Sequence, residues 1–274
     1  MLNDNSILKN VKINPAEYVK FQEIIYKTTG IELKENKQNL IQSRLMKRLR
    51  HHNIDSYGAY YNLIIKDKDE LQLMINQVTT NETSFFRENK HFDYLARKIL
   101  PQAKERVKIW SAASSIGVEA YTIAMIVDET LSPRHLPFEI LASDINIDVL
   151  KQADEAVYDI RFAKNIPQGY LKRYCLKGVG TMENKFSINS YLKQKLSFAQ
   201  INLTQTIGSH VGQFDIIFLR NVLIYFDVQT KKNVVRNVLK HLKTGGYFFI
   251  GHSETLFNIS DEVVQVMPTV YQKV

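Results

Sequence analysis

The chain has 274 residues, a formal charge of +8 and a single cysteine, Cys175. One cysteine excludes a disulfide within the chain and a metal site built from several thiolates, so we expect a reducing compartment, the cytoplasm. The first ten residues lack the apolar segment of a secretory signal, and no apolar run reaches membrane-spanning length. We therefore expect no membrane insertion, and the basic charge favours an acidic partner.

Residues 1–88 have the periodicity of helices. Pro15 lies near the start of the first, which Thr29-Gly30 ends; the second covers residues 36–52, a third begins at Ser56, and residues 71–78 form a short fourth. We therefore expect an N-terminal all-helical domain over residues 1–88.

The predicted helix at 36–52 carries basic side chains opposite an apolar stripe of Ile41, Leu45 and Leu49. Arg44, Lys47 and Arg48 share one face because they lie three and four residues apart, and no acid lies between them in the sequence. We expect an outward-facing, unneutralised basic surface, which would suit docking of an acidic partner. The alternative is a basic face that is merely solvated.

Residues 79–88, TTNETSFFRE, are rich in hydrogen-bonding side chains and precede a helical pattern at 91–100. One interpretation is a capped helix start, with Asn81 or Thr83 as the cap and the two phenylalanines in the core. The other is a lid over a nucleoside pocket, in which Arg87 holds a carboxylate.

A small-residue loop follows the predicted strand at 107–112 and leads through Gly117 into a helix. Small residues let the backbone approach a ligand, and the helix start offers free N–H groups. The next predicted strand ends in Asp144. In Rossmann-like sheets an acid in this place binds ribose hydroxyls. The dinucleotide glycine pattern is absent, which argues against a pyrophosphate.

The rest of the chain alternates strands and helices, which predicts a mostly parallel, doubly wound sheet over residues 89–274. Residues 168–200 interrupt the rhythm with the short strands KFSIN and KLSFAQI, so we expect a small antiparallel β subdomain inserted there. Asn202 and Arg220-Asn221 lie just beyond strand ends, where such sheets bind ligands.

Taken together, the motifs resemble those of the chemotaxis receptor glutamate methyltransferases, the CheR family. The matching stretches keep the family's order: TTNETSFFRE, IWSAASSIGVEAYTIAM, ASDINIDVL, INL at 201–203, FDIIFLRNVLIYF and LKTGGYFFIGHSETL. The resemblance implies an α/β fold: a Rossmann-like S-adenosylmethionine-dependent methyltransferase domain with an inserted antiparallel β subdomain, preceded by an all-helical domain. It also implies methylation of receptor glutamates to γ-methyl esters, with S-adenosylhomocysteine as the product.

The resemblance further implies which residues bind the cofactor: Asn81, Thr83, Arg87, Glu119, Asp144, Asn202, Leu203, Arg220 and Asn221. These residue types fit the cofactor's groups. A guanidinium can bind the carboxylate of the methionine part, and carboxylates can bind its ammonium group and the ribose hydroxyls. The implied partner is the cytoplasmic domain of chemotaxis receptors, and we expect a monomer with no metal. The family often has Gly-Cys where this chain has Ala113-Ser114, an acid at Val118 and proline at Ala120.

Two alternatives remain. A nucleic-acid methyltransferase would suit the basic charge, but the motif after the comparable strand is R-N-V-L-I-Y, which lacks the N-P-P-Y or D-P-P-Y pattern of amino-methylating enzymes. A non-catalytic module that binds the nucleoside or a receptor would suit the altered loop at 113–120.

Overall fold

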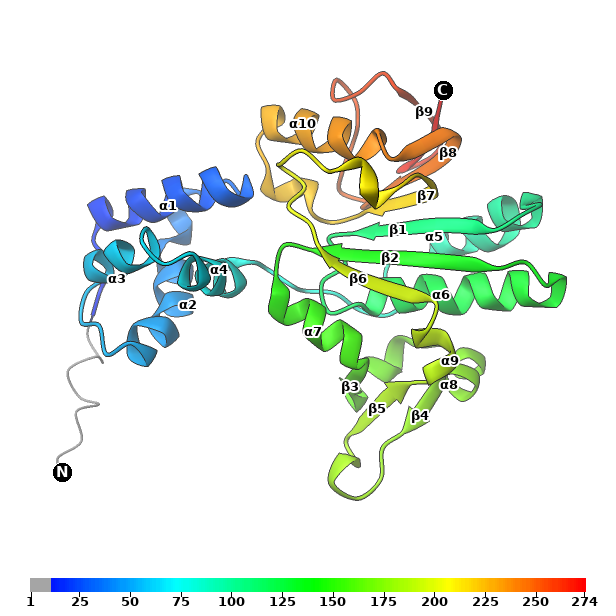
Figure 1. Ribbon diagram of the computed structural model, residues 1–274, viewed down its shortest axis with the longest axis horizontal. Coiled ribbons are helices and arrows are strands. Elements are labelled where there is room, and N and C mark those ends of the chain that lie inside the picture. Colours follow the sequence, from blue (N-terminus) through cyan, green and yellow to red (C-terminus); the bar gives the residue numbers. More distant parts are fainter. Residues whose placement is uncertain (1–10) are drawn as a thin grey trace. The chain divides into compact units, whose positions relative to one another are not determined.

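The computed structural model describes residues 11–274; the expectation about a secretory signal concerns the first ten residues, which lie outside this range. The chain divides into two compact units (Figure 1). The first contains residues up to Thr80 together with Tyr225–Asp227, and the second contains Asn81–Ile224 and Val228–Val274. The segment 81–88, which the sequence interpretation grouped with the helical domain, lies in the second unit.

The first unit is helical, as predicted. Its α-helices are α1 (Pro15–Thr29), α2 (Gln38–His51, after the short 3-10 helix η2, Glu35–Lys37), α3 (Tyr57–Ile64) and α4 (Lys68–Val78). Asn14 and Glu17 form a capping box that begins α1, and Gly30 in the left-handed conformation ends it. The apolar stripe of α2 is fully buried. From the second piece of chain, Phe226 forms an isolated bridge with Ile31.

The second unit contains a seven-stranded sheet in the order β6-β2-β1-β7-β8-β10-β9. Its first five strands are parallel neighbours, whereas β10 and β9 are antiparallel additions. The bounds are β1 (Val107–Ala112), β2 (Phe138–Asp144), β6 (Leu196–Gln200), β7 (Phe214–Leu219), β8 (Leu242–Ile250), β9 (Val263–Met267) and β10 (Val270–Lys273). This order confirms the predicted doubly wound α/β fold.

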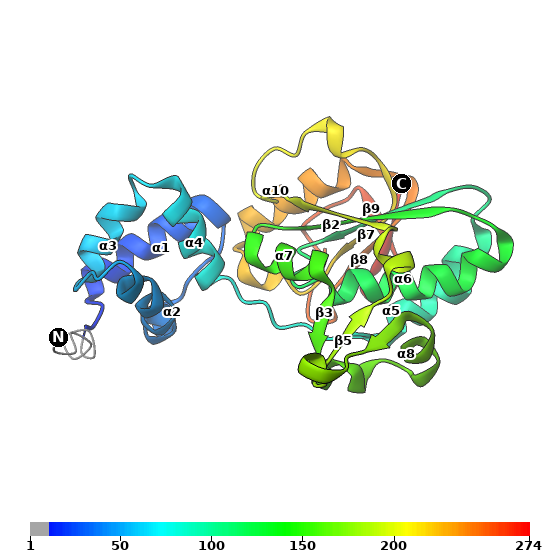
Figure 2. The same cartoon turned by 60° about the horizontal axis from the view of Figure 1, so that its bottom comes forward.

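Helices connect the parallel strands. The main ones are α6 (Val118–Leu131), α7 (Ile147–Glu155) and α10 (Val228–Leu239), which Figure 2 shows from a second side. Before β1 the chain forms α5 (Asn89–Tyr94), a π-helical stretch η3 (Leu95–Ile99) and the 3-10 helix η4 (Leu100–Gln102); η5 (Ser132–Arg134) follows α6. Helix α6 is buried along most of its length and packs on β2 and the β subdomain, which places it in the centre of the core.

The inserted subdomain is an antiparallel sheet in the order β3-β5-β4, with β3 (Val157–Asp159), β4 (Cys175–Lys177) and β5 (Lys185–Ile188). It also holds η6 (Ile160–Asn165), α8 (Gln168–Tyr174), η7 (Gly180–Met182) and α9 (Ser190–Lys193). The expectation for KLSFAQI was wrong: these residues form β6, which pairs in parallel with β2 in the main sheet. Short strands carry no signal of the sheet they join, because pairing is decided by tertiary contacts.

In the part of the chain that the structure describes, no helix is both long and apolar enough to cross a bilayer.

Candidate functional site

The register of the parallel strands aligns their carboxyl ends. Ala112 of β1 lies opposite Ser143 of β2 and Leu219 of β7, and Leu219 lies opposite Ile250 of β8. The residues that follow these four strands therefore emerge at one edge of the sheet. They are the β1–α6 loop, Asp144, Arg220-Asn221 and the Gly251-His252 turn, so the structure gathers the predicted segments where α/β sheets bind ligands.

The β1–α6 loop uses left-handed backbone at three of five positions: φ is +59° at Ala113, +52° at Ser115 and +82° at Gly117. Glycine adopts this region without strain, whereas alanine and serine do not. At Gly117 a second constraint applies, because a Cβ there would lie 2.7 Å from the Cβ of Ala153. The loop is thus tightly folded, and Gly117 lets α6 begin against α7.

Asp144 is the last residue of β2, and its side chain holds this loop. Its Oδ2 accepts a 2.9 Å hydrogen bond from the Ser115 backbone N–H, and its Oδ1 accepts a 3.0 Å bond from that of Asn146. Burial raises the pKa of the Asp144 carboxyl, and these backbone donors counteract the rise. The predicted ribose-binding acid therefore lies directly against the small-residue loop.

Glu119 and Glu88 form a charge network around the buried side chain of Arg220. The Arg220 side chain is 1% exposed; its Nη1 lies 2.9 Å from Glu119 Oε2 and its Nη2 lies 2.8 Å from Glu88 Oε2. Glu119 also accepts a 2.7 Å hydrogen bond from the Ser111 hydroxyl of β1. Two carboxylates thus hold one guanidinium, which is how a charge can be buried without a large penalty.

Asn221 has left-handed backbone, with φ +58°. Its side-chain amide donates to Glu88 Oε1 at 3.1 Å, and its backbone N–H donates to Glu254 Oε2 at 3.0 Å. The neighbouring Gly251 has no room for a side chain, since a Cβ there would lie 2.4 Å from Asn221 Nδ2. The GHSE turn after β8 therefore packs directly on Asn221.

The segment 81–88 approaches the same edge. The Asn81 carbonyl accepts a 3.2 Å hydrogen bond from the Ser115 hydroxyl, and the Arg87 carbonyl accepts a 2.6 Å bond from Arg220 Nη2. The Arg87 side chain itself donates to the Glu82 carbonyl. Thr83 is half-buried. The two phenylalanines, Phe85 and Phe86, are buried in the core, so the segment is anchored there as well.

Asn202 and Leu203 follow β6. The Ile201 N–H donates to the Asp144 carbonyl at 3.1 Å, which places this stretch beside the end of β2. Asn202 Oδ1 accepts hydrogen bonds from the backbone N–H and hydroxyl of Thr204. Leu203 is buried. Both residues therefore lie in the loop next to Asp144.

The three predicted docking residues lie in the first unit, and the expectation that no acid neutralises them was wrong for Arg48. Arg48 Nε donates to Glu70 Oε1 at 2.9 Å, and the Arg48 side chain is only 13% exposed. Burial alone would raise the pKa of the Glu70 carboxyl. Hydrogen bonds from Arg48, Tyr60 and His52 outweigh burial and lower this pKa to about 2. The partner Glu70 lies on α4, so the spacing of residues within α2 could not reveal this ion pair.

The other two docking residues, Arg44 and Lys47, differ from each other in their surroundings. The Arg44 guanidinium donates to the carbonyls of Val78 and Thr79 at the end of α4. Lys47 is exposed. Of the three, Lys47 is therefore the residue whose charge faces solvent as the sequence interpretation required, while Arg44 and Arg48 bind α4.

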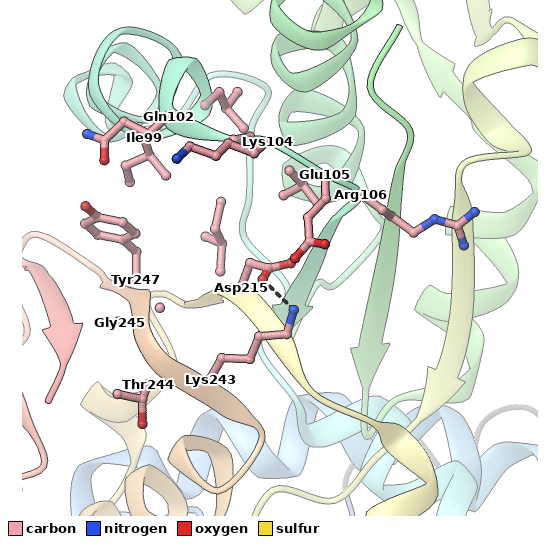
Figure 3. Close-up of a pocket in the computed structure, with 15 residues that line it drawn as sticks. Ile99, Gln102, Lys104, Glu105, Arg106, Asp215, Lys243, Thr244, Gly245 and Tyr247 are labelled. Carbon is pink, nitrogen blue, oxygen red and sulfur yellow. Dashed lines mark hydrogen bonds and ion pairs between the residues drawn. The ribbon is translucent and has the colours of Figure 1, made fainter.

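A separate hollow of about 610 Å³ lies at the other end of the strands (Figure 3). Its lining includes Val107, the first residue of β1, and Asp215 at the start of β7, where Lys243 forms a 2.7 Å ion pair with Asp215. Ligands of parallel α/β sheets bind at the carboxyl ends of the strands. We therefore place the candidate site at the edge that carries Asp144 and not in this hollow.

Sequence reasoning missed the roles of Glu88 and Glu254. Glu88 ends the stretch TTNETSFFRE and Glu254 lies within LKTGGYFFIGHSETL, both of which the sequence interpretation had singled out, so the residues were visible but their partners were not. Glu88 is separated from Arg220 by 132 positions and from His252 by 164. Only the fold brings such groups together.

Comparisons with known proteins identify the family to which the chain belongs. Residues 16–79 match the model of the CheR methyltransferase all-alpha domain, and residues 81–272 match that of the CheR methyltransferase SAM binding domain. A chemotaxis protein methyltransferase of Borreliella burgdorferi is 37% identical, with 99% of each chain covered. Chemotaxis protein methyltransferase 2 of Pseudomonas aeruginosa is 38% identical over 93% of this chain and 92% of its own, and the Escherichia coli relative is 35% identical over 96% and 92%. The chain therefore belongs to the CheR family of S-adenosylmethionine-dependent chemotaxis methyltransferases.

Proposed function

We propose that the chain methylates glutamate side chains of chemotaxis receptors, forming γ-methyl esters during sensory adaptation. The observation that carries the proposal is the Asp144 carboxylate, hydrogen-bonded to the small-residue loop at the carboxyl edge of the sheet. The relatives' names, chemotaxis protein methyltransferase, support a chemotaxis protein as the substrate. The cytoplasmic receptor domains are the proposed partner, and the protein acts in the cytoplasm as a monomer without a nucleic-acid substrate.

The proposed cofactor site uses the residues at this edge. Asp144 binds the ribose, Glu119 and Arg87 bind the polar ends of the methionine part, and the other lining residues are Asn81, Thr83, Asn202, Leu203, Arg220 and Asn221. The donor set fits such a group, because acids, amides and a guanidinium surround a loop of small residues. The buried Ser114 hydroxyl, which has no hydrogen-bond partner within the described residues, also lies in this loop.

The reaction needs little acid–base chemistry. When bound, S-adenosylmethionine would supply a methyl group on a sulfonium sulfur, and the sulfur leaves readily as the neutral thioether of S-adenosylhomocysteine. A receptor glutamate is already ionised at pH 7, so its oxygen forms the new O–C bond as the C–S bond breaks, and no proton moves. The protein's contribution is to hold the two reactants in line and to exclude water. We therefore assign binding roles and no catalytic base.

Of the three residues that the sequence suggested for docking, we propose Lys47, which is exposed on α2, as the docking residue, because Arg48 pairs with Glu70 and Arg44 donates to the end of α4. The methylated regions are expected, from the family resemblance, to be helical and rich in glutamate. An exposed positive charge would then act through steering and register, and its effect would weaken as salt rises.

The test is incubation with methyl-labelled S-adenosylmethionine and receptor-containing membranes from the source organism. The proposal predicts label on the receptor that is released as methanol by mild base, because esters hydrolyse readily. Base-stable label in nucleic acid would replace the proposal with the nucleic-acid alternative. Binding of S-adenosylhomocysteine without turnover on any receptor would support a non-catalytic module instead.

A further inference from the structure

We propose that Glu88 is a positioning residue of the methyltransferase site. Its carboxylate connects the 81–88 segment to the ends of β7 and β8, and it thereby sets the positions of Arg220 and Asn221. The inference rests on the proposed cofactor site, since it gives Glu88 no contact with the cofactor and lets it act through two residues that line that site.

The Glu88 carboxylate accepts hydrogen bonds from three residues in two other segments of chain. Oε2 accepts from Arg220 Nη2 at 2.8 Å and from the His252 backbone N–H at 3.2 Å, while Oε1 accepts from Asn221 Nδ2 at 3.1 Å. Arg220 and Asn221 follow β7, and His252 follows β8. One side chain therefore fixes a guanidinium, an amide and a turn, and hydrogen bonds to a charged acceptor are stronger than neutral ones.

The backbone of Glu88 is itself unusual. Its φ is +61°, in the left-handed region that residues with a side chain seldom adopt. Such a conformation persists only where the surroundings determine it, and it is concentrated at functional sites. Here the buried rings of Phe85 and Phe86 anchor the preceding residues, with Phe85 5.2 Å from the ring of Tyr158. The segment is thus held so that the Glu88 carboxylate points at Arg220.

Charge balance makes Glu88 hard to replace. The buried Arg220 guanidinium lies between the carboxylates of Glu88 and Glu119 and 5.3 Å from the ring centre of Phe92. Burial alone would raise the pKa of the Glu88 carboxyl. The charge of Arg220, together with hydrogen bonds from Arg220, Asn221 and the His252 backbone, outweighs burial and lowers this pKa to about 2. Without Glu88, Arg220 would pair with Glu119 alone, which is proposed to bind the cofactor.

Glu254 holds Asn221 from another direction. It accepts hydrogen bonds from the backbone N–H groups of Asn221 and Gly251, at 3.0 and 2.6 Å. The two acids therefore act on different parts of Asn221: Glu254 fixes its backbone and Glu88 fixes its side-chain amide. Removing Glu88 should free the amide while the strand end stays in place.

Glu88 also lies near His91 and His252, and the possible ligand atoms of the three lie within 4.8 Å of one another. We favour the positioning role over a metal site for two reasons. Glu88 Oε2 already accepts two hydrogen bonds, and a divalent cation would lie beside the Arg220 guanidinium.

The experiment measures the affinity of the full chain for S-adenosylhomocysteine by calorimetry, together with kcat and KM for both substrates. Glu88→Gln keeps the shape and removes the charge. We expect its Kd for S-adenosylhomocysteine and its KM for S-adenosylmethionine to rise at least about tenfold, equivalent to about 1.4 kcal/mol. The KM for the receptor should stay within about twofold, because Glu88 does not lie on the docking helix.

Glu82→Gln is the matched control. Glu82 lies in the same segment and its side chain is exposed, so this variant should behave like the wild type. In an Asn221→Ala background the effect of Glu88→Gln on Kd should shrink to below about threefold, since Glu88 acts in part through Asn221. If Glu88→Gln fails to fold, Glu88→Asp, which keeps the charge on a shorter arm, should fold and show an intermediate Kd.

A folded Glu88→Gln protein with a Kd within about twofold of the wild type would overturn the inference. So would a Glu88→Asp protein with wild-type affinity, if only that variant folds. These results are distinct from failure of the proposed function. A wild-type protein that binds S-adenosylhomocysteine but leaves receptors unmethylated would refute the proposed substrate, and the affinity comparison would still decide the role of Glu88.

Discussion

The backbone N–H of Ser115 donates a 2.9 Å hydrogen bond to Oδ2 of Asp144. This bond joins the loop after β1 to the last residue of β2, so the acid and the small-residue loop lie in direct contact. A ligand that uses the carboxylate must then lie against the loop backbone.

Asp144→Asn should weaken binding of S-adenosylhomocysteine. The change removes the charge that strengthens hydrogen bonds from hydroxyls, and each such bond is worth on the order of 1.5–3 kcal/mol. Calorimetry measures the effect, and Asp148→Asn is the control because Asp148 is exposed on the first turn of α7. Equal affinity in both variants would show that Asp144 does not hold the ribose.

Arg48→Glu should destabilise the helical unit, contrary to the expectation of a freely exposed face. Breaking a buried ion pair by changing one partner costs about 3 kcal/mol or more, and here two carboxylates would meet. Thermal unfolding should show the loss, while Lys47→Glu should leave the melting temperature within about 1 °C because surface substitutions change little. A normal melting temperature for Arg48→Glu would show that the Glu70 pair contributes nothing.

Lys47→Glu also tests docking without the loss of stability. We expect a lower initial rate of receptor methylation, most clearly at low salt, with unchanged affinity for S-adenosylhomocysteine, because the changed charge acts on encounter with an acidic surface. Rates are measured at two ionic strengths. Wild-type rates that do not fall as salt rises would support the merely solvated face.

Ala113→Gly should stabilise the protein by about 1 kcal/mol, since a left-handed φ of +59° strains alanine and not glycine. Gly117→Ala should do the reverse, because it adds strain at φ +82° and a Cβ 2.7 Å from that of Ala153. Chemical denaturation of both variants gives the two free energies of unfolding. An unstable Ala113→Gly protein would contradict the loop geometry.

The wild type should lose stability as the pH falls from about 6.5 towards 3. Burial, with the Arg220 charge, lowers the pKa of His91 to about 3, so the folded protein keeps His91 neutral while the unfolded chain gains a proton near pH 6.5. Because the unfolded state then binds more protons, its free energy falls relative to the folded state by up to about 1.4 kcal/mol per pH unit. The charged or titratable groups that face His91 are Glu88, Arg220 and His252.

His91→Gln isolates this effect. Glutamine can replace the 2.7 Å hydrogen bond of His91 to the Thr269 hydroxyl but does not titrate. Denaturation at several pH values should therefore show a shallower slope between pH 6 and 4.5 in the variant. The depressed pKa values of Glu70 and Glu88 act below about pH 4.5 and are common to both proteins. Equal slopes would contradict a neutral, buried His91.

The fold followed from the sequence because its signals are local. Proline, capping residues and helical spacing define α1 and α2, and the strand–loop–helix pattern around Gly117 defines the first part of the sheet. The placement of β6 could not be predicted, since a short strand pairs with whichever edge the tertiary structure offers. The same holds for Arg48, whose partner lies on another helix, and for Glu88, whose partners are more than a hundred residues away.

The helical unit is built from two separate pieces of chain, because Tyr225–Asp227 belong to it and Phe226 pairs with Ile31. The Tyr26 hydroxyl also donates to Asp227 at 2.6 Å. A fragment that stops at residue 80 would thus lack part of its own packing, because the Phe226–Ile31 bridge and the Tyr26–Asp227 hydrogen bond would be lost. A fragment designed to contain the helical unit alone therefore has to include residues 225–227, for example as a peptide joined to residue 80 by a linker.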